Sequence, residues 1–275
     1  METGTIRAAI LDLYNNEENQ EIRCIKEILA HSNRTYNNIP VEFNLFNIRG
    51  SAETAAPNYD IYISSGGPGS PWDGLGTKWE SGYFSLLDSL WSHNQKNESK
   101  KYLFFICHSF QIMARYFGIA DVTKRDSESF GVAAIRKTEA GMGDYLFNNL
   151  PDPFYGADFR SWQVINPDRK RFDDLGAKIL CLENEGPDAN PPQALTAVRI
   201  NDEFAGTQFH PESDVESLRY YFHKPERRER FETKYGAENY LSMLRELEEP
   251  AGLSLTRRTI LPNFLKHAIT KLRPH

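Results

Sequence analysis

Short apolar runs and amphipathic stretches alternate along the first half of the chain. The apolar runs have the length of strands and cover residues 6–13, 41–48, 59–64 and 102–106. Two other stretches, 18–31 and 77–91, repeat apolar residues every three or four positions, which predicts amphipathic helices. Strands that alternate with helices favour an α/β fold, with an open, mostly parallel sheet and helices on both faces.

The second half of the chain is richer in predicted strands. A short helix is expected at 144–150, and the expected strands are 127–138, 154–165, 177–183, 194–200 and 205–209. Charged residues dominate after Glu212, and their pattern predicts helices that include 239–247 and 264–272. We therefore expect one domain over 1–213, and a helical C-terminal extension over 214–275 that packs on it.

Composition narrows the class of protein. The 275 residues are 40% hydrophobic and 25% charged, as in a soluble globular protein. The net charge of −6, without a long basic block, argues against a nucleic-acid partner. We expect no transmembrane helix and no secretory signal, and therefore no membrane partner. Three scattered cysteines do not suggest a disulfide framework, so a reducing cytoplasm is the expected setting.

The stretch around Cys107 carries the clearest indication of chemistry. The apolar run 102–106 ends at this cysteine, and a helical pattern over 108–117 follows directly. Ligands of open α/β sheets bind at the carboxyl ends of strands. A helix N-terminus at that place lowers the pKa of a thiol and offers N–H groups to an anion. Cys107 is therefore a candidate nucleophile, and a buried structural cysteine is the alternative.

Two other segments could complete a site around this thiol. Residues 65–71, Ser-Gly-Gly-Pro-Gly-Ser-Pro, follow an apolar run and form a tight turn whose backbone N–H groups can face an oxyanion. His210 and Glu212 are two positions apart, so in extended chain they point to the same side. The carboxylate can then orient the imidazole as a base for a thiol. An ordinary loop and a surface histidine beside an acid are the alternatives.

The order of these three segments resembles the class I (triad) glutamine amidotransferase family. The motifs are the glycine loop at 65–71, Cys-His-Ser-Phe-Gln at 107–111 and Gln-Phe-His-Pro-Glu at 208–212, and the resemblance covers roughly residues 5–213. It implies a flavodoxin-like sheet and hydrolysis of the glutamine side-chain amide through a thioester, with release of ammonia. It implies no cofactor and no metal. Amidotransferase domains of GMP synthase and their stand-alone relatives have a similar pattern.

The resemblance also implies roles for single residues. Cys107 would be the nucleophile, His210 its base, and Glu212 the group that orients His210. The backbone N–H groups of Gly67 and His108 would form the oxyanion hole.

Substrate positioning would fall to Gln111, Ser161 and Trp162. The family has glycine two residues before and two residues after the nucleophile, whereas this chain has Phe105 and Ser109. A nucleophile elbow is a strained turn that favours small neighbours. These two positions therefore bear directly on whether the site is active.

Three functions stay open at this stage. An amidotransferase would bind glutamine and pass ammonia to a separate synthetase partner, because a tail of about 60 residues is short for a second domain. A hydrolase of γ-glutamyl peptides or other γ-glutamyl amides would use the same triad without a partner. A binding module of the same fold would have lost catalysis. The sequence leaves the oligomeric state open.

Overall fold

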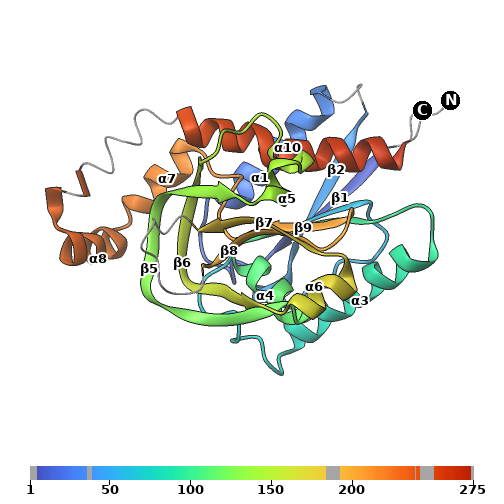
Figure 1. The fold of residues 1–275 in the computed structure, drawn as a ribbon, viewed down its shortest axis with the longest axis horizontal. Coiled ribbons are helices and arrows are strands. Elements are labelled where there is room, and N and C mark those ends of the chain that lie inside the picture. The colour runs from blue at the N-terminus through green and yellow to red at the C-terminus, as the bar shows by residue number, and fades with distance from the viewer. Residues whose placement is uncertain (1–4, 36–38, 184–192, 239, 242–250, 274–275) are drawn as a thin grey trace.

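One mixed sheet runs through the molecule (Figure 1). The computed structural model describes residues 5–35, 39–183, 193–238, 240–241 and 251–273. The order of the described strands across the sheet is β2-β1-β3-β4-β9-β8-β7-β5-β6. Their bounds are β1 Ile6–Asp12, β2 Val41–Asn47, β3 Ile61–Ser64, β4 Tyr102–Ile106, β5 Ala120–Lys137, β6 Phe154–Pro167, β7 Lys178–Glu183, β8 Leu195–Arg199 and β9 Phe204–Thr207.

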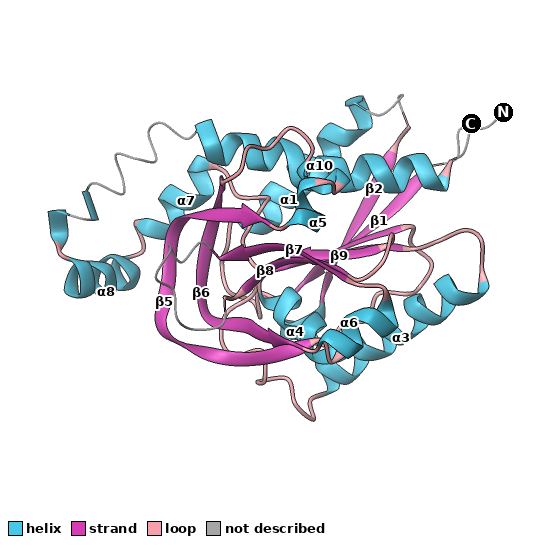
Figure 2. Cartoon of the chain, in the orientation of Figure 1, coloured by secondary structure: helices cyan, strands magenta, loops and turns pink. Residues whose placement is uncertain are grey.

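Helices cover both faces of this sheet (Figure 2). Among the described helices, none combines the length and the apolar character needed to cross a membrane. The longer helices are α1 Glu21–Thr35, α3 Lys78–Lys96, α4 His108–Phe117, α7 Val215–Phe222, α8 Pro225–Tyr235 and α10 Ala251–Leu272. The short ones are α2 Ile48–Ser51, α5 Glu139–Met142, the 3₁₀ turn η1 Tyr145–Phe147, and α6 Arg169–Leu175.

Strand β4 lies in the parallel half of the sheet and is buried throughout. It pairs in parallel with β3 on one side and β9 on the other. Its side chains alternate between two apolar cores: Phe104 packs with residues of α1 and α10, and Phe105 with residues of α3 and α4. Burial on both faces explains the continuous apolar run in the sequence. The arrangement confirms the expected α/β fold with an open, mostly parallel sheet.

The long hairpin of β5 and β6 stands at one edge of the sheet and curves away from it (Figure 1). It carries a third apolar cluster, in which Phe130 and Phe159 contact Phe222 of α7 and Phe231 of α8. Strand β5 begins at Ala120, seven residues before the expected start at 127, because its first part pairs with β6. This first part of β5 has exposed polar residues, so it does not appear as an apolar run in the sequence.

Helix α10 packs lengthwise on the molecule. Its Phe264 ring lies 5.1 Å from the Phe104 ring, centroid to centroid. The helix begins at Ala251 and includes Pro262, whereas the sequence predicted a helix only over 264–272. The helix predicted at 239–247 falls mostly outside the described residues. The proposed division of the chain at residue 213 stays a prediction.

Candidate active site

Cys107 occupies a strained turn between β4 and α4. Its backbone has φ 49° and ψ −100°, a conformation that non-glycine residues rarely adopt. The residue is 4% exposed and caps the N-terminus of α4. Strain of this kind costs about 1–3 kcal/mol and persists where the surrounding structure holds it, often at active sites. The sharp turn expected between the buried strand and the helix is therefore present, with Cys107 at its centre.

Phe105 fits beside this turn because its neighbour on the next strand is glycine. Phe105 pairs with Gly206 of β9, and the ring is fully buried against Phe204 at 6.2 Å between centroids. A Cβ atom at Gly206 would lie 2.8 Å from the Phe105 carbonyl oxygen and 2.9 Å from the Phe105 Cβ. The missing side chain of Gly206 thus provides the space that Phe105 fills.

We predict that Gly206→Ala destabilises the fold and disturbs the elbow. The added methyl group meets backbone atoms that cannot rotate away, and overpacking of a buried site costs about 1–3 kcal/mol. Thermal unfolding should show a Tm lower by several degrees. Gly143→Ala is the control, because a Cβ there meets nothing within 4 Å. An unchanged Tm for Gly206→Ala would contradict the explanation given for Phe105.

Ser109 stabilises the elbow through its hydroxyl group. The Ser109 Oγ accepts a hydrogen bond from the Ile106 N–H at 2.8 Å and donates one to the Ser64 carbonyl at 2.8 Å. These bonds join the ends of β4 and β3 directly beneath Cys107. A buried hydroxyl with two such partners is fully compatible with the turn.

His210 and Glu212 lie together beside Cys107. The His210 Nδ1 is 2.9 Å from the Glu212 Oε1. The ring lies next to Cys107, because a Cβ atom added at Gly66 would be 2.7 Å from the His210 Cε1 and 3.6 Å from the Cys107 Cβ. Since Glu212 engages Nδ1, Nε2 is the nitrogen available to the sulfur. Burial alone would lower the pKa of His210, but the charges of Cys107 and Glu212 and the hydrogen bonds to both raise it well above 6.5. The imidazole therefore favours its protonated form.

The C-terminal helix α10 contacts the backbone at Glu212. Arg257 of α10 donates a hydrogen bond to the backbone carbonyl of Glu212 and pairs with Glu27 of α1 at 2.7 Å. Glu212 itself is fully buried. The backbone at this residue is thus tied to α10, which lies beyond the three sequence motifs.

The glycine loop lies beside Cys107. An added Cβ at Gly67 would lie 2.4 Å from the Leu13 carbonyl oxygen, so only glycine fits there without a shift. Arg49 supports the loop from outside by donating a hydrogen bond to the Pro68 carbonyl. Gly67 and His108 line one pocket together with Cys107.

The His108 side chain remains neutral beside the nucleophile. Burial, together with the positive charges of Arg49 and Arg115, lowers its pKa to about 3. Because the ring is uncharged, the groups at this place that can interact with an anion are the His108 backbone N–H and the N-terminus of α4.

Gln111 is linked to Cys107 through a second glutamine, Gln208. The Gln111 Nε2 donates to the Trp162 carbonyl at 3.2 Å and to the Gln208 Oε1 at 3.1 Å. The Gln208 amide nitrogen lies 3.7 Å from the Cys107 sulfur. The sequence analysis included Gln208 in the motif at 208–212 but gave this residue no role. The available signal was its position two residues before His210 on the same extended segment.

A pocket of about 260 Å³ opens on one side of Cys107. It brings together Gln111, Ser161 and Trp162, the three residues expected to position the substrate. Ser161 also donates a hydrogen bond to Glu128 at 2.8 Å, so Glu128 becomes part of the pocket wall. The sequence analysis missed Glu128, because it lies in the polar half of β5 and belongs to no motif.

A smaller pocket of about 50 Å³ opens beside Cys107, next to the His210 ring. Tyr14 and Glu21 line it with His210. Burial raises the pKa of the Glu21 carboxyl, against the opposing effect of His210. Cys107 therefore lines both the larger pocket and a small one with acidic residues.

The chain was compared with known proteins. The family model "Glutamine amidotransferase class-I" matches residues 21–224. The structure of a glutamine amidotransferase from Thermotoga maritima is similar to this chain, with a TM-score of 0.70 at 14% identity. The match covers 97% of this chain and 99% of the Thermotoga maritima protein. A GMP synthase-type protein from Thermoplasma acidophilum has a TM-score of 0.52 at 17% identity, covering 90% and 98%.

The glutaminase domain of the Trypanosoma brucei CTPS, with bound acivicin, has a TM-score of 0.54 at 13% identity, covering 89% and 94%. A search of curated protein sequences gave no match. The fold and the extent of the family match define the class: an α/β protein of the amidotransferase type. The chain belongs to the class I glutamine amidotransferase family.

Proposed function

We propose that the chain hydrolyses the side-chain amide of glutamine and releases ammonia, with Cys107, His210 and Glu212 as its catalytic triad. The observation that carries the proposal is the convergence of these three side chains at the elbow. The Glu212 Oε1 lies 2.9 Å from the His210 Nδ1, and the His210 ring and Cys107 line the same small cavity. This is the arrangement in which a base activates a nucleophile and is itself oriented by a third group.

The chemistry follows from the positions of these groups. The Cys107 sulfur attacks the amide carbon, and the oxygen of the tetrahedral intermediate is stabilised by backbone N–H groups of Gly67 and His108. Protonated His210 then gives its proton to the leaving nitrogen, so that ammonia departs and a γ-glutamyl thioester remains. Water, deprotonated by His210, hydrolyses the thioester to glutamate and restores the thiol.

We propose glutamine as the substrate over γ-glutamyl compounds with larger amines. The leaving nitrogen must lie next to the His210 ring to receive its proton, and the cavity that this ring lines is the smaller of the two at Cys107, about 50 Å³. Hydrolysis of γ-glutamyl peptides, the alternative from the sequence, would place a larger amine on this side of the site.

The test combines ammonia release with intact-mass measurement. Incubation with glutamine should release ammonia, and a glutamine-like electrophile should add once per chain, at Cys107. Cys24 and Cys181 serve as internal controls, because burial raises the pKa of Cys24 to about 12 and that of Cys181 well above 9. Cys107→Ala should abolish both results, and Cys24→Ala neither.

Two outcomes would count against the proposal. Ammonia release that survives in Cys107→Ala would remove the thioester mechanism. A wild-type chain that releases no ammonia and is not labelled at Cys107 would favour a binding module without catalysis. Faster turnover of a γ-glutamyl peptide than of glutamine would favour the hydrolase alternative.

We also propose that a separate synthetase uses the ammonia. The likeness to the GMP synthase-type protein of Thermoplasma acidophilum supports this partner class. Glutaminase activity that rises when a synthetase is added would agree with it, and full activity without any partner would favour a stand-alone enzyme.

A further inference from the structure

The connection between β1 and α1 brings a tyrosine to the small pocket beside Cys107. Tyr14 lies two residues after the end of β1, and the family model begins only at residue 21. The Tyr14 N–H donates a hydrogen bond to the Asp12 carboxylate at 2.8 Å. The neighbouring Leu13 N–H donates one to the Ser65 hydroxyl at 2.9 Å, which ties the end of β1 to the glycine loop after β3. Because β1 and β3 are parallel, their carboxyl ends meet at the edge of the sheet where the site lies.

The Tyr14 hydroxyl reaches the place where Cys107 and His210 meet. The Cβ position at Gly66, which is 2.7 Å from the His210 Cε1, is also 3.0 Å from the Tyr14 hydroxyl oxygen. The Cys107 Cβ is 3.6 Å from the same position. Tyr14, His210 and Cys107 also line the 50 Å³ pocket together. The phenol oxygen is therefore a third polar group beside the sulfur and the imidazole.

This hydroxyl is available to a molecule in the small pocket. The Tyr14 ring is partly buried and packs on the core. Among the hydrogen bonds of the described residues, Tyr14 takes part through its backbone N–H and not through its hydroxyl group. Burial and the charges of Glu21, Glu212 and Cys107 raise the pKa of the hydroxyl well above 10. It therefore keeps its proton and can both accept and donate a hydrogen bond.

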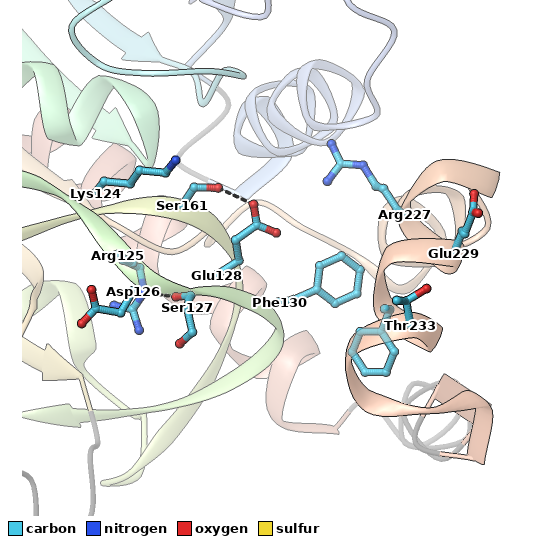
Figure 3. A pocket seen from close by; sticks show the side chains of 11 residues that line it. Lys124, Arg125, Asp126, Ser127, Glu128, Phe130, Ser161, Arg227, Glu229 and Thr233 are labelled. Atoms are coloured by element: carbon cyan, nitrogen blue, oxygen red, sulfur yellow. Dashed lines mark hydrogen bonds between the residues drawn. The ribbon is translucent and has the colours of Figure 1, made fainter.

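The larger pocket at Cys107 is walled by other elements. Glu128 of β5 and Arg227 of α8 line it, and both also line a neighbouring cavity of about 530 Å³ between α8 and the β5–β6 hairpin (Figure 3). Cys107 lines both the larger pocket and the small one, whereas Tyr14 and His210 line the small one. An amide held at the sulfur, with its nitrogen next to His210, thus directs that nitrogen toward Tyr14 and its acyl chain into the larger pocket.

We propose that the Tyr14 hydroxyl is a further catalytic group, which accepts a hydrogen bond first from the leaving nitrogen and then from the hydrolytic water. The inference rests on the proposed function and adds a residue to its machinery. In the first tetrahedral intermediate the nitrogen carries two hydrogens and a lone pair. A hydrogen bond from one N–H to Tyr14 turns the lone pair toward protonated His210. The proton passes to nitrogen, the C–N bond breaks, and ammonia leaves the thioester.

The same arrangement serves the second half of the reaction. Water takes the place of ammonia, with one O–H directed to the His210 Nε2 and the other donated to Tyr14. A lone pair of the water oxygen then faces the thioester carbon. As the C–O bond forms, His210 takes the first proton. The C–S bond then breaks, this proton returns to the sulfur, and glutamate leaves. Tyr14 orients both molecules and keeps its own proton throughout.

The γ-methyl ester of glutamate tests this role, because its leaving oxygen carries no hydrogen. Tyr14→Phe should lower kcat/KM for glutamine by about 2- to 10-fold, as expected for one neutral hydrogen bond. It should leave kcat/KM for the ester unchanged, since kcat/KM reports the step up to departure of the leaving group. Thioester hydrolysis is common to both substrates and should slow by a similar factor. Intact mass after rapid quenching, with the ester in excess, should therefore show more acylated Cys107 in Tyr14→Phe than in wild type.

Tyr220→Phe is the matched control. Tyr220 of α7 lines the same small pocket, with the Lys224 ammonium 4.9 Å from the centroid of its ring. This variant loses the same atom and should handle both substrates as the wild type does. Tyr14→Phe keeps the ring that packs on the core, so its circular dichroism and Tm should match wild type. Equal losses on glutamine and the ester in Tyr14→Phe, or the same selective loss in Tyr220→Phe, would overturn the proposal.

The wild-type results keep this inference apart from the proposed function. A wild-type chain that hydrolyses neither compound would overturn both. A wild-type chain that hydrolyses glutamine through Cys107, together with a Tyr14→Phe chain of equal kcat/KM for glutamine, would overturn the role of Tyr14 alone.

Discussion

His210→Ala is expected to lower kcat/KM for glutamine by about 10⁴- to 10⁶-fold, the range found when a nucleophile loses its base. The physical reason is that both half-reactions of the proposed mechanism need the ring. In that mechanism His210 protonates the leaving nitrogen in the first and removes a proton from water in the second. Steady-state ammonia release measures the loss, with Cys107→Ala as the reference for a chain without a nucleophile.

Glu212→Gln should cost less than His210→Ala and should change the pH profile. The charge of Glu212 is one of the causes that raise the pKa of His210, against the effect of burial. A neutral amide removes that contribution, so the pKa of His210 falls. The protonated ring, which serves as the acid, is then lost at a lower pH, and the alkaline limb of kcat/KM should move toward acid. A larger loss for Glu212→Gln than for His210→Ala would mean that the roles are misassigned.

Gly67→Ala is expected to lower kcat by about 10²- to 10³-fold, the effect of losing one oxyanion donor. The added Cβ would lie 2.4 Å from the Leu13 carbonyl oxygen, and this is a backbone atom at the end of β1. The loop must therefore move away from its place beside Cys107. KM should change much less than kcat, because the donor acts on the transition state.

The control for Gly67→Ala is Gly143→Ala, which meets no neighbouring atom within 4 Å. Circular dichroism and Tm should show that Gly67→Ala is folded. Labelling of Cys107 by a small neutral alkylating agent should continue, since the thiol and its base remain. Wild-type kcat in Gly67→Ala would exclude this loop from the oxyanion hole.

The parallel half of the fold was predictable because its strands are buried on both faces. A strand such as β4 then appears as an unbroken apolar run, and the motif at its end could be placed from the sequence alone. Strand β5 was harder, because its first half is polar and is held by pairing with β6. Helix α6, Arg169–Leu175, was missed because it is short and highly charged.

The residues of the candidate site also fall into two groups, those that the sequence predicted and those that it did not. Cys107, His210 and Glu212 could be proposed because each lies in a compact motif next to a predicted strand. Glu128 and Arg227 could not, because the fold brings them together from distant segments with no local pattern. The length of α10 was also hidden, since Pro262 suggested a helix that starts near that point, whereas packing continues it back to Ala251.

The pairing of Phe105 with Gly206 has a consequence for how the family motif can vary. A side chain at position 206 would occupy the place that the carbonyl oxygen and the Cβ of Phe105 now take. The two positions therefore constrain each other across the ladder. A phenylalanine two residues before Cys107 is compatible with the strained turn because its register partner on the adjacent strand is glycine.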